Sequence, residues 1–262
     1  MAYNFGLNVF LWSAEFTKSQ YPLLSRIKGW GYDTVELPLL NPEGLDVPRI
    51  AGLLGEVGLD CSFCTVLPPK AHLGSAAAEV RKAGRQFIRK CVETAAKLGS
   101  DMVAGPLYSP VGYMTGNPRT GAEWKRAVQC YKEIAKVAED QGVTVAVEPL
   151  NRFETYFLNT ASDARRFVEE VDSPRIGILF DTFHSNIEEK NVPEALRAAG
   201  PKVAHIHISE NDRGVPGSGH TDWKGMRAAV REIGYRGRLV VETFGYALPG
   251  LSRAASIWRP LF

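Results

Sequence analysis

The sequence predicts a single-domain (β/α)₈ barrel, or TIM barrel, spanning residues 1–262. Three observations predict this fold: eight short apolar runs of strand length, amphipathic segments between them, and a chain of 262 residues. Repeated strand–helix units give a parallel sheet, and eight units in about 250 residues is typical of a closed barrel. A doubly wound open sheet is the alternative, but no G-x-G-x-x-G motif follows the first run.

The predicted strands are short runs that are rich in Val, Ile and Leu. Several carry these residues at both odd and even positions, as parallel strands buried on both faces do. In order, the predicted strands are 5–12, 34–39, 61–67, 102–108, 143–149, 176–182, 203–209 and 239–244.

The segments between the runs have helical periodicity. Leu23, Leu24, Ile27 and Trp30, for example, share one face of a helix. Glycines follow several of these segments, where helices are expected to end. The predicted helices are 22–30, 48–57, 75–98, 121–141, 161–171, 192–199 and 223–233.

Composition excludes several classes of protein. Hydrophobic residues make up 45% and charged residues 23% of the chain, as in ordinary globular proteins. The formal charge of +2 is too small for a nucleic-acid-binding surface, and no apolar stretch approaches the ~18 residues of a membrane span. The first residues lack the charged and apolar regions of a signal peptide. We therefore expect a cytoplasmic protein with no nucleic-acid or membrane partner.

Candidate metal ligands end four consecutive predicted strands. Such a carboxylate, placed after buried aliphatic residues, is costly unless a cation or a partner compensates it. In a barrel these strand ends form the active-site face. Four such residues at one level indicate a shared ion rather than unrelated structural pairs. We call them the strand-end cluster: Glu148, Asp181, His207 and Glu242.

The ligand set limits the metal and the substrate. Three carboxylates and one imidazole, without a thiolate, favour one divalent ion such as Mn²⁺, Mg²⁺ or Co²⁺ over structural zinc. Three negative charges against two positive ones suit a small neutral substrate better than a phosphate. A phosphorylated ketose remains an alternative, because the glycine-rich loop 214–219 follows the seventh strand, where barrels often bind phosphate.

Other residues near these strand ends are candidates for substrate contacts. Polar side chains in the following loops can bond sugar oxygens, and aromatic side chains can wall the pocket. The polar candidates are Glu154, His184 and Arg213, and the aromatic candidates are Trp12, Trp124 and Phe244.

Two further histidines need separate interpretation. His205 has the same strand parity as His207 but lies further from the end of the strand. We therefore expect His205 to be a buried, hydrogen-bonded residue and not the ligand. His72 is expected on a surface loop.

Four motifs carry a resemblance to a known family. They are EPLNRFE (148–154), FDTFH (180–184), HIHISENDRGVPGSGHTDW (205–223) and VVETF (240–244). In order and spacing they resemble the ketose 3-epimerases typified by D-tagatose 3-epimerase and D-psicose (allulose) 3-epimerase, within the sugar isomerase/epimerase barrels.

This resemblance implies a set of roles. Mn²⁺, or a similar ion, would be bound by the strand-end cluster, and Glu154, His184 and Arg213 would contact O1 and O2 of the substrate. Homodimers or homotetramers are usual in the family. Family members generally continue after an IWRP-like sequence, so we expect a short, truncated last helix here.

The predicted reaction inverts C3 of a free ketohexose or ketopentose, of the D-tagatose, D-fructose/D-psicose or L-ribulose type. Glu148 and Glu242 would act as acid and base on opposite faces of a cis-enediolate, which the metal stabilises. The same metal ligands and acid–base pair are also compatible with two alternative activities, a sugar or hydroxypyruvate isomerase and an inosose dehydratase. A DNA-repair nuclease of the endonuclease IV type would need more metal ligands and a basic groove.

Overall fold

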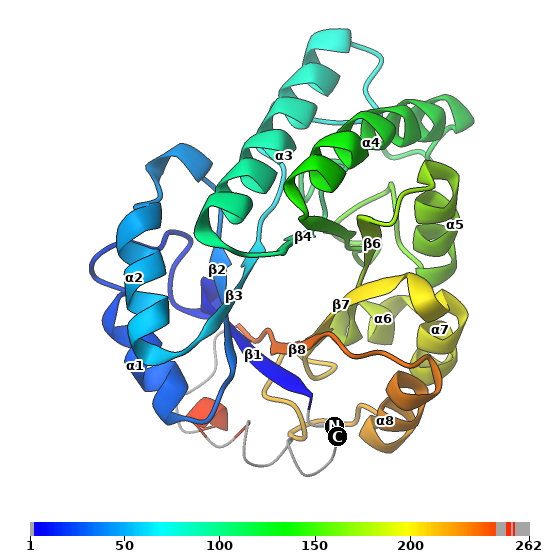
Figure 1. The fold of residues 1–262 in the computed structure, drawn as a ribbon. Helices are drawn as coiled ribbons and strands as arrows, with labels where there is room; N and C mark the ends of the chain where they lie inside the picture. Colours follow the sequence, from blue (N-terminus) through cyan, green and yellow to red (C-terminus); the bar gives the residue numbers. More distant parts are fainter. Residues whose placement is uncertain (1–2, 245–249, 253, 255–262) are drawn as a thin grey trace.

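The computed structural model describes residues 3–244, 250–252 and 254, and it contains a closed barrel of parallel strands ringed by helices (Figure 1). Each strand pairs with the next in the chain, and β8 pairs with β1 through Phe5 and Leu239 to close the ring. The strands are β1 Asn4–Asn8, β2 Thr34–Pro38, β3 Asp60–Cys64, β4 Met102–Gly105, β5 Thr144–Val147, β6 Ile176–Asp181, β7 Val203–Ile208 and β8 Arg238–Val241. The predicted barrel is confirmed.

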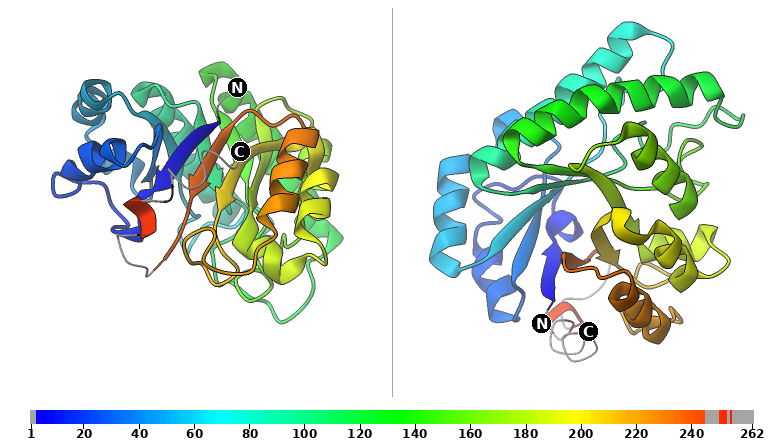
Figure 2. Two further views of the ribbon diagram at one scale, coloured as in Figure 1. Left: turned by 90° about the horizontal axis from the view of Figure 1, so that it is seen from below. Right: turned by 45° about the vertical axis from the view of Figure 1, so that its right-hand side comes forward.

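The α-helices cover the outside of the barrel, and α3 packs beside α4 (Figures 1 and 2). They are α1 Pro22–Gly29, α2 Val47–Val57, α3 Ala78–Leu98, α4 Gly121–Gln141, α5 Ala161–Val171, α6 Thr182–Glu188, α7 Val192–Ala199 and α8 Trp223–Glu232. Short 3₁₀ helices occur at η1 Val9–Leu11, η2 Pro42–Gly44 and η3 Gly200–Lys202. In the described part of the chain, no helix is long and apolar enough to cross a membrane.

The helix boundaries follow from local chemistry. The Thr120 side chain accepts a hydrogen bond from the backbone of Glu123, whose own side chain bonds back to Thr120, and this reciprocal capping box starts α4. Gly142 ends the same helix in the left-handed conformation, which glycine adopts without strain. All seven predicted helices are present.

One helix, α6, was not predicted. It begins at Thr182, directly after β6, and the Asp181 side chain caps it by accepting a hydrogen bond from the backbone N–H of Phe183 at 2.7 Å. Because no polar loop separates β6 from α6, the sequence pattern does not show where the strand ends and the helix begins. The expectation of a short last helix concerns residues after Phe244, most of which lie outside the described residues.

Inside the barrel, the strand-end cluster lies above a layer of buried apolar residues. Met102, Ala104, Ala146 and Leu179 form a separate buried cluster. Side chains two residues apart share one face of a strand, so Glu148 follows Ala146 on that face and Asp181 follows Leu179. The carboxylates are therefore held at the strand ends above an apolar layer.

Gly105, at the end of β4, allows a close approach between neighbouring strands. Its φ is +136°, and an added Cβ would lie 2.0 Å from the carbonyl oxygen of Thr65. Its own carbonyl accepts a hydrogen bond from the backbone N–H of Glu148 at 3.1 Å. A side chain at this position would push apart the backbone that places Glu148.

Candidate active site

The structure brings the strand-end cluster together at the carboxyl ends of β5 to β8. One donor atom from each of Glu148, Asp181, His207 and Glu242 lies within 4.8 Å of all the others, and all four residues are buried. Asp181 and His207 are paired across β6 and β7, whereas Glu148 and Glu242 lie one residue beyond β5 and β8.

Two atoms of this cluster fit a metal ion particularly well. Asp181 Oδ2 and His207 Nδ1 are buried and have no hydrogen-bond partner among the described residues. His207 Nδ1 is 3.5 Å from Glu242 Oε1, and the two atoms do not form a hydrogen bond. Unpaired buried polar atoms are rare and costly, and carboxylates with an imidazole suit a hard or intermediate divalent ion.

The electrostatics of the cluster favour the binding of a cation. Burial, followed by the negative charge of Glu242, raises the pKa of Asp181 to about 7. The same two causes raise the pKa of Glu148 well above its usual range. Burial also acts to raise the pKa of Glu242, but His207 and Arg213 outweigh it and hold that pKa at about 2. A divalent cation would relieve this repulsion between carboxylates.

His184, in α6, points one ring nitrogen at the cluster. Its Nδ1 accepts a hydrogen bond from the backbone N–H of Asn151 at 3.1 Å, so the proton of the neutral ring belongs on Nε2. Nε2 lies 3.7 Å from Glu148 Oε1 and 3.8 Å from Asp181 Oδ2. Because burial lowers the pKa of His184 to about 3, the ring is neutral at pH 7 and offers an N–H donor.

Arg213 reaches the cluster from the loop between β7 and α8. Its guanidinium donates a hydrogen bond to Glu242 Oε2 at 3.1 Å and lies 3.8 Å from Glu154 Oε1. The guanidinium carbon is 4.5 Å from the ring centres of both Phe183 and Phe244. These contacts hold the cation over the cavity, with a backbone φ of +65° that few residues other than glycine adopt.

A cavity of about 180 Å³ opens beside these groups. Its polar lining comes from residues already described, namely Glu148, Glu154, His184, Arg213 and Glu242. The rest of the lining is apolar or a thiol, and consists of Phe10, Cys64, Val66, Pro106, Val111, Leu150 and Phe244. The cavity is therefore lined by both hydrogen-bonding and apolar groups, as small-molecule sites usually are.

Two predicted wall residues lie elsewhere. Trp12 follows η1 and packs against Trp30, with ring centres 6.2 Å apart, and it does not line the cavity. Trp124 is buried on α4, where its indole N–H donates to Glu170 Oε2 at 2.7 Å. Neither tryptophan is among the residues that line this cavity, because each packs against a neighbouring helix, whereas Phe244 does line it.

Two polar residues next to the cluster were not predicted from the sequence. Glu36 on β2 is fully buried, and its Oε1 lies 2.6 Å from His207 Nε2. The amide of Asn8, at the end of β1, donates to Glu242 Oε1 at 3.0 Å. Glu36 is the one acidic residue within the buried run T-V-E-L-P, and this position could have indicated a buried, paired carboxylate. His205, expected to be buried and paired, has its Nε2 2.8 Å from Glu36 Oε2.

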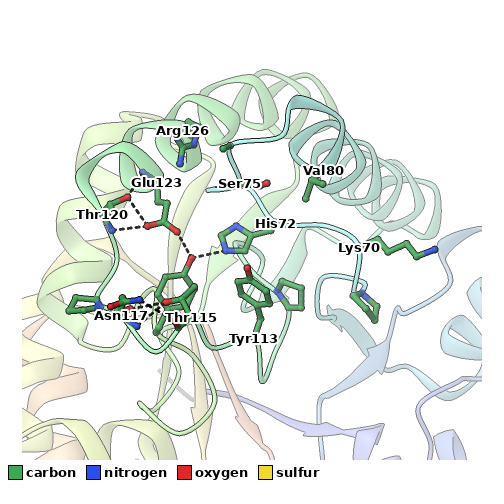
Figure 3. Close-up of a pocket in the computed structure, with 15 residues that line it drawn as sticks. Lys70, His72, Ser75, Val80, Tyr113, Thr115, Asn117, Thr120, Glu123 and Arg126 are labelled. Atoms are coloured by element: carbon green, nitrogen blue, oxygen red, sulfur yellow. Dashed lines mark hydrogen bonds between the residues drawn. The ribbon is translucent and has the colours of Figure 1, made fainter.

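A second, larger cavity of about 730 Å³ lies outside the strand-end cluster, beside the starts of α3 and α4 (Figure 3). His72 lines it and is buried, so the prediction of a surface position was wrong. Its Nε2 is 3.0 Å from the Tyr156 hydroxyl, which in turn donates to Glu123 Oε1 at 2.6 Å. These contacts tie the loop after β5 to the start of α4.

Fold and site together define a single-domain barrel enzyme with a carboxylate-rich centre at the active-site face. The family described as "Xylose isomerase-like TIM barrel" matches residues 24–259. The chain belongs to this family.

Similar proteins narrow the class further. A probable ketose 3-epimerase of Synechocystis sp. is 31% identical, over 97% of this chain and 89% of the relative. An L-ribulose 3-epimerase of Mesorhizobium japonicum is 33% identical, over 98% of this chain and 87% of the relative. A crystal structure of D-psicose 3-epimerase in the presence of D-fructose superimposes with a TM-score of 0.90 at 27% identity, covering 100% of this chain and 99% of that chain. The protein is thus an isomerase, of the epimerase type.

Proposed function

We propose that the protein is a metal-dependent ketose 3-epimerase that inverts C3 of a free ketohexose or ketopentose. One observation carries this proposal: two glutamates from different sides of the barrel, Glu148 and Glu242, reach one buried centre with the unpaired atoms of Asp181 and His207. The names of the relatives, which include L-ribulose and D-psicose 3-epimerases, support the same reaction.

The strand-end cluster would hold one divalent ion, for which Mn²⁺ is our first candidate and Mg²⁺ or Co²⁺ are alternatives. When bound, the ion supplies Lewis-acid polarisation of the substrate carbonyl. His207 would use Nδ1, because its Nε2 is engaged by Glu36.

Glu148 and Glu242 would move the protons. Inversion requires that one carboxylate removes the proton from C3 and that the other delivers a proton to the opposite face of the resulting cis-enediolate. In the reverse reaction the two residues exchange these roles.

Three other residues would bind the substrate end that carries O1 and O2. His184 offers the Nε2–H donor, Arg213 offers a guanidinium, and Glu154 accepts from a hydroxyl. Among the residues that the structure describes, Arg213 is the only Lys or Arg side chain in the cavity lining. This supports a neutral sugar over a sugar phosphate, whose charge three carboxylates would repel.

We also propose a homodimer or homotetramer in the cytoplasm. Large apolar side chains are exposed in the loops after β4 and β5, with Phe153 75% exposed and Tyr113 and Met114 each 48% exposed, which supports burial against another subunit. The four cysteines are free and buried, in keeping with a reducing compartment.

The proposed reaction is tested by measuring where deuterium from the solvent enters the substrate. Protein stripped with EDTA and reloaded with Mn²⁺ is given D-tagatose, D-fructose, D-psicose, L-ribulose or hydroxypyruvate in D₂O, and proton NMR follows each substrate. Metal-dependent deuterium incorporation at C3, with appearance of the C3 epimer, is expected. Exchange at C1 or C2 without a C3 epimer would instead identify an aldose–ketose or hydroxypyruvate isomerase. Water loss would identify a dehydratase.

A further inference from the structure

A fifth buried carboxylate lies behind the strand-end cluster. Glu36 on β2 is 0% exposed, and its carboxylate contacts residues from three other strands. Oε1 accepts from Asn8 Nδ2 at 3.1 Å and lies 2.6 Å from His207 Nε2. Oε2 accepts from Ser62 Oγ at 2.9 Å and lies 2.8 Å from His205 Nε2. Glu36 is not a member of the strand-end cluster, although with His205 and His207 it forms a second buried group that could hold an ion.

The first link from Glu36 to the cluster is through His207. With its Nε2 turned to Glu36, the imidazole presents Nδ1 to the other three donors. Nδ1 has no partner among the described residues, so its lone pair is free for an ion when the proton sits on Nε2. Glu36 thus selects which nitrogen faces the centre.

The second link is through Asn8. The same Nδ2 group donates to Glu36 Oε1 at 3.1 Å and to Glu242 Oε1 at 3.0 Å. The other side of the amide is also fixed, because Oδ1 accepts from the backbone N–H of Phe10 at 2.8 Å. Asn8 therefore connects Glu36 to a second member of the strand-end cluster.

We propose that Glu36 is a positioning residue for the metal centre: it orients His207 directly and Glu242 through Asn8. A carboxylate behind a ligating histidine also makes the imidazole a stronger donor to a metal. This inference rests on the proposed function, because it assumes that the strand-end cluster holds a divalent ion.

A purely structural role for Glu36 makes a different prediction. A residue that only satisfied its neighbours would, when replaced, lower stability without a specific effect on metal binding. Glu188 provides the matched comparison: its side chain is 5% exposed and accepts hydrogen bonds from the backbone N–H and guanidinium of Arg152. It contacts no member of the strand-end cluster.

The test compares metal-free wild type, Glu36→Gln and Glu188→Gln. Mn²⁺ binding is measured without substrate, by titration calorimetry and by the EPR signal of free Mn²⁺. We expect Glu36→Gln to weaken Mn²⁺ binding by about 10- to 100-fold, and Glu188→Gln to leave it within about twofold. With a substrate that wild type converts, excess Mn²⁺ should restore much of the activity of Glu36→Gln.

The outcomes separate this inference from the proposed function. If wild type does not bind Mn²⁺, Mg²⁺ or Co²⁺, the metal centre itself is wrong. If wild type binds Mn²⁺ and folded Glu36→Gln binds it equally well, the positioning role is overturned. If circular dichroism shows that Glu36→Gln is not folded, Asn8→Ala is used instead. It cuts only the second link, so an affinity loss of several-fold supports that link and unchanged affinity removes Asn8 and Glu242 from the inference.

Discussion

At the scale of single residues, the two glutamates of the strand-end cluster have different surroundings. Glu242 is held by Asn8 and Arg213, at 3.0 and 3.1 Å, and the positive charges near it keep its pKa low. Glu148 Oε1 lies 3.7 Å from His184 Nε2, and burial together with the negative charge of Glu242 raises the pKa of Glu148. The pKa values of the two glutamates are therefore shifted in opposite directions.

Replacing either glutamate tests the acid–base proposal. Glu148→Gln and Glu242→Gln keep the size of the side chain but cannot accept a proton at neutral pH. We expect each to lower turnover by at least about 10²- to 10⁴-fold, measured with Mn²⁺ in excess, while circular dichroism shows a folded protein. Near-wild-type turnover in either variant would remove that glutamate from the mechanism.

The raised pKa values also make metal binding depend on pH. Below about pH 7, Asp181 carries a proton that an incoming ion must displace, and above it Asp181 is ionised. The pKa of Glu148 is shifted in the same direction. Mn²⁺ affinity is therefore expected to fall as the pH drops from about 8 to about 6. Calorimetry in two buffers with different ionisation enthalpies should also show proton release, and a flat affinity across this range would contradict the prediction.

At the scale of elements, the loop between β7 and α8 places a cation over the cavity. Arg213 has a φ of +65° and is stacked between Phe183 and Phe244, so the loop and both aromatic rings fix the position of its guanidinium. A flexible ammonium group cannot reproduce these contacts.

Arg213→Lys tests this arrangement. We expect KM for the sugar to rise by about tenfold, because lysine keeps the charge but loses the planar stacking and the paired donors. Steady-state kinetics measures the effect. The control is Arg152→Lys, whose parent residue is exposed and pairs with Glu188 outside the cavity. Equal KM values for Arg213→Lys and wild type would exclude a substrate contact.

The strands, the helices and most of the strand-end cluster could be predicted from the sequence, whereas several side-chain directions could not. Eight strands and seven helices follow from hydrophobic periodicity, and the members of the strand-end cluster follow from polar residues at strand ends. Trp12 and Trp124 were misplaced because the direction of an aromatic side chain depends on which helix packs beside it. Glu36 was missed because its histidine partners, His205 and His207, come from β7, which only the closed barrel brings near β2.

At the scale of the whole molecule, a metal that binds only the folded state should stabilise it. With free Mn²⁺ at 100 times Kd, linkage gives about 2.7 kcal/mol, which for a chain of this size raises Tm by several degrees. Scanning calorimetry of EDTA-stripped and Mn²⁺-loaded protein measures this shift. Asp181→Asn should show a much smaller shift, and the same shift in both proteins would place the ion elsewhere.

The hydrogen bond between Asn8 and Glu242 joins residues 234 positions apart, across the seam where β8 meets β1. During synthesis, the ribosome must therefore release nearly the whole barrel before the last ligand can reach its place. A nascent chain that ends before β8 would have three of the four donors and no closed ring. The complete ion site would thus form only after β8 pairs with β1. Metal binding by nascent chains of increasing length would therefore report when the barrel closes.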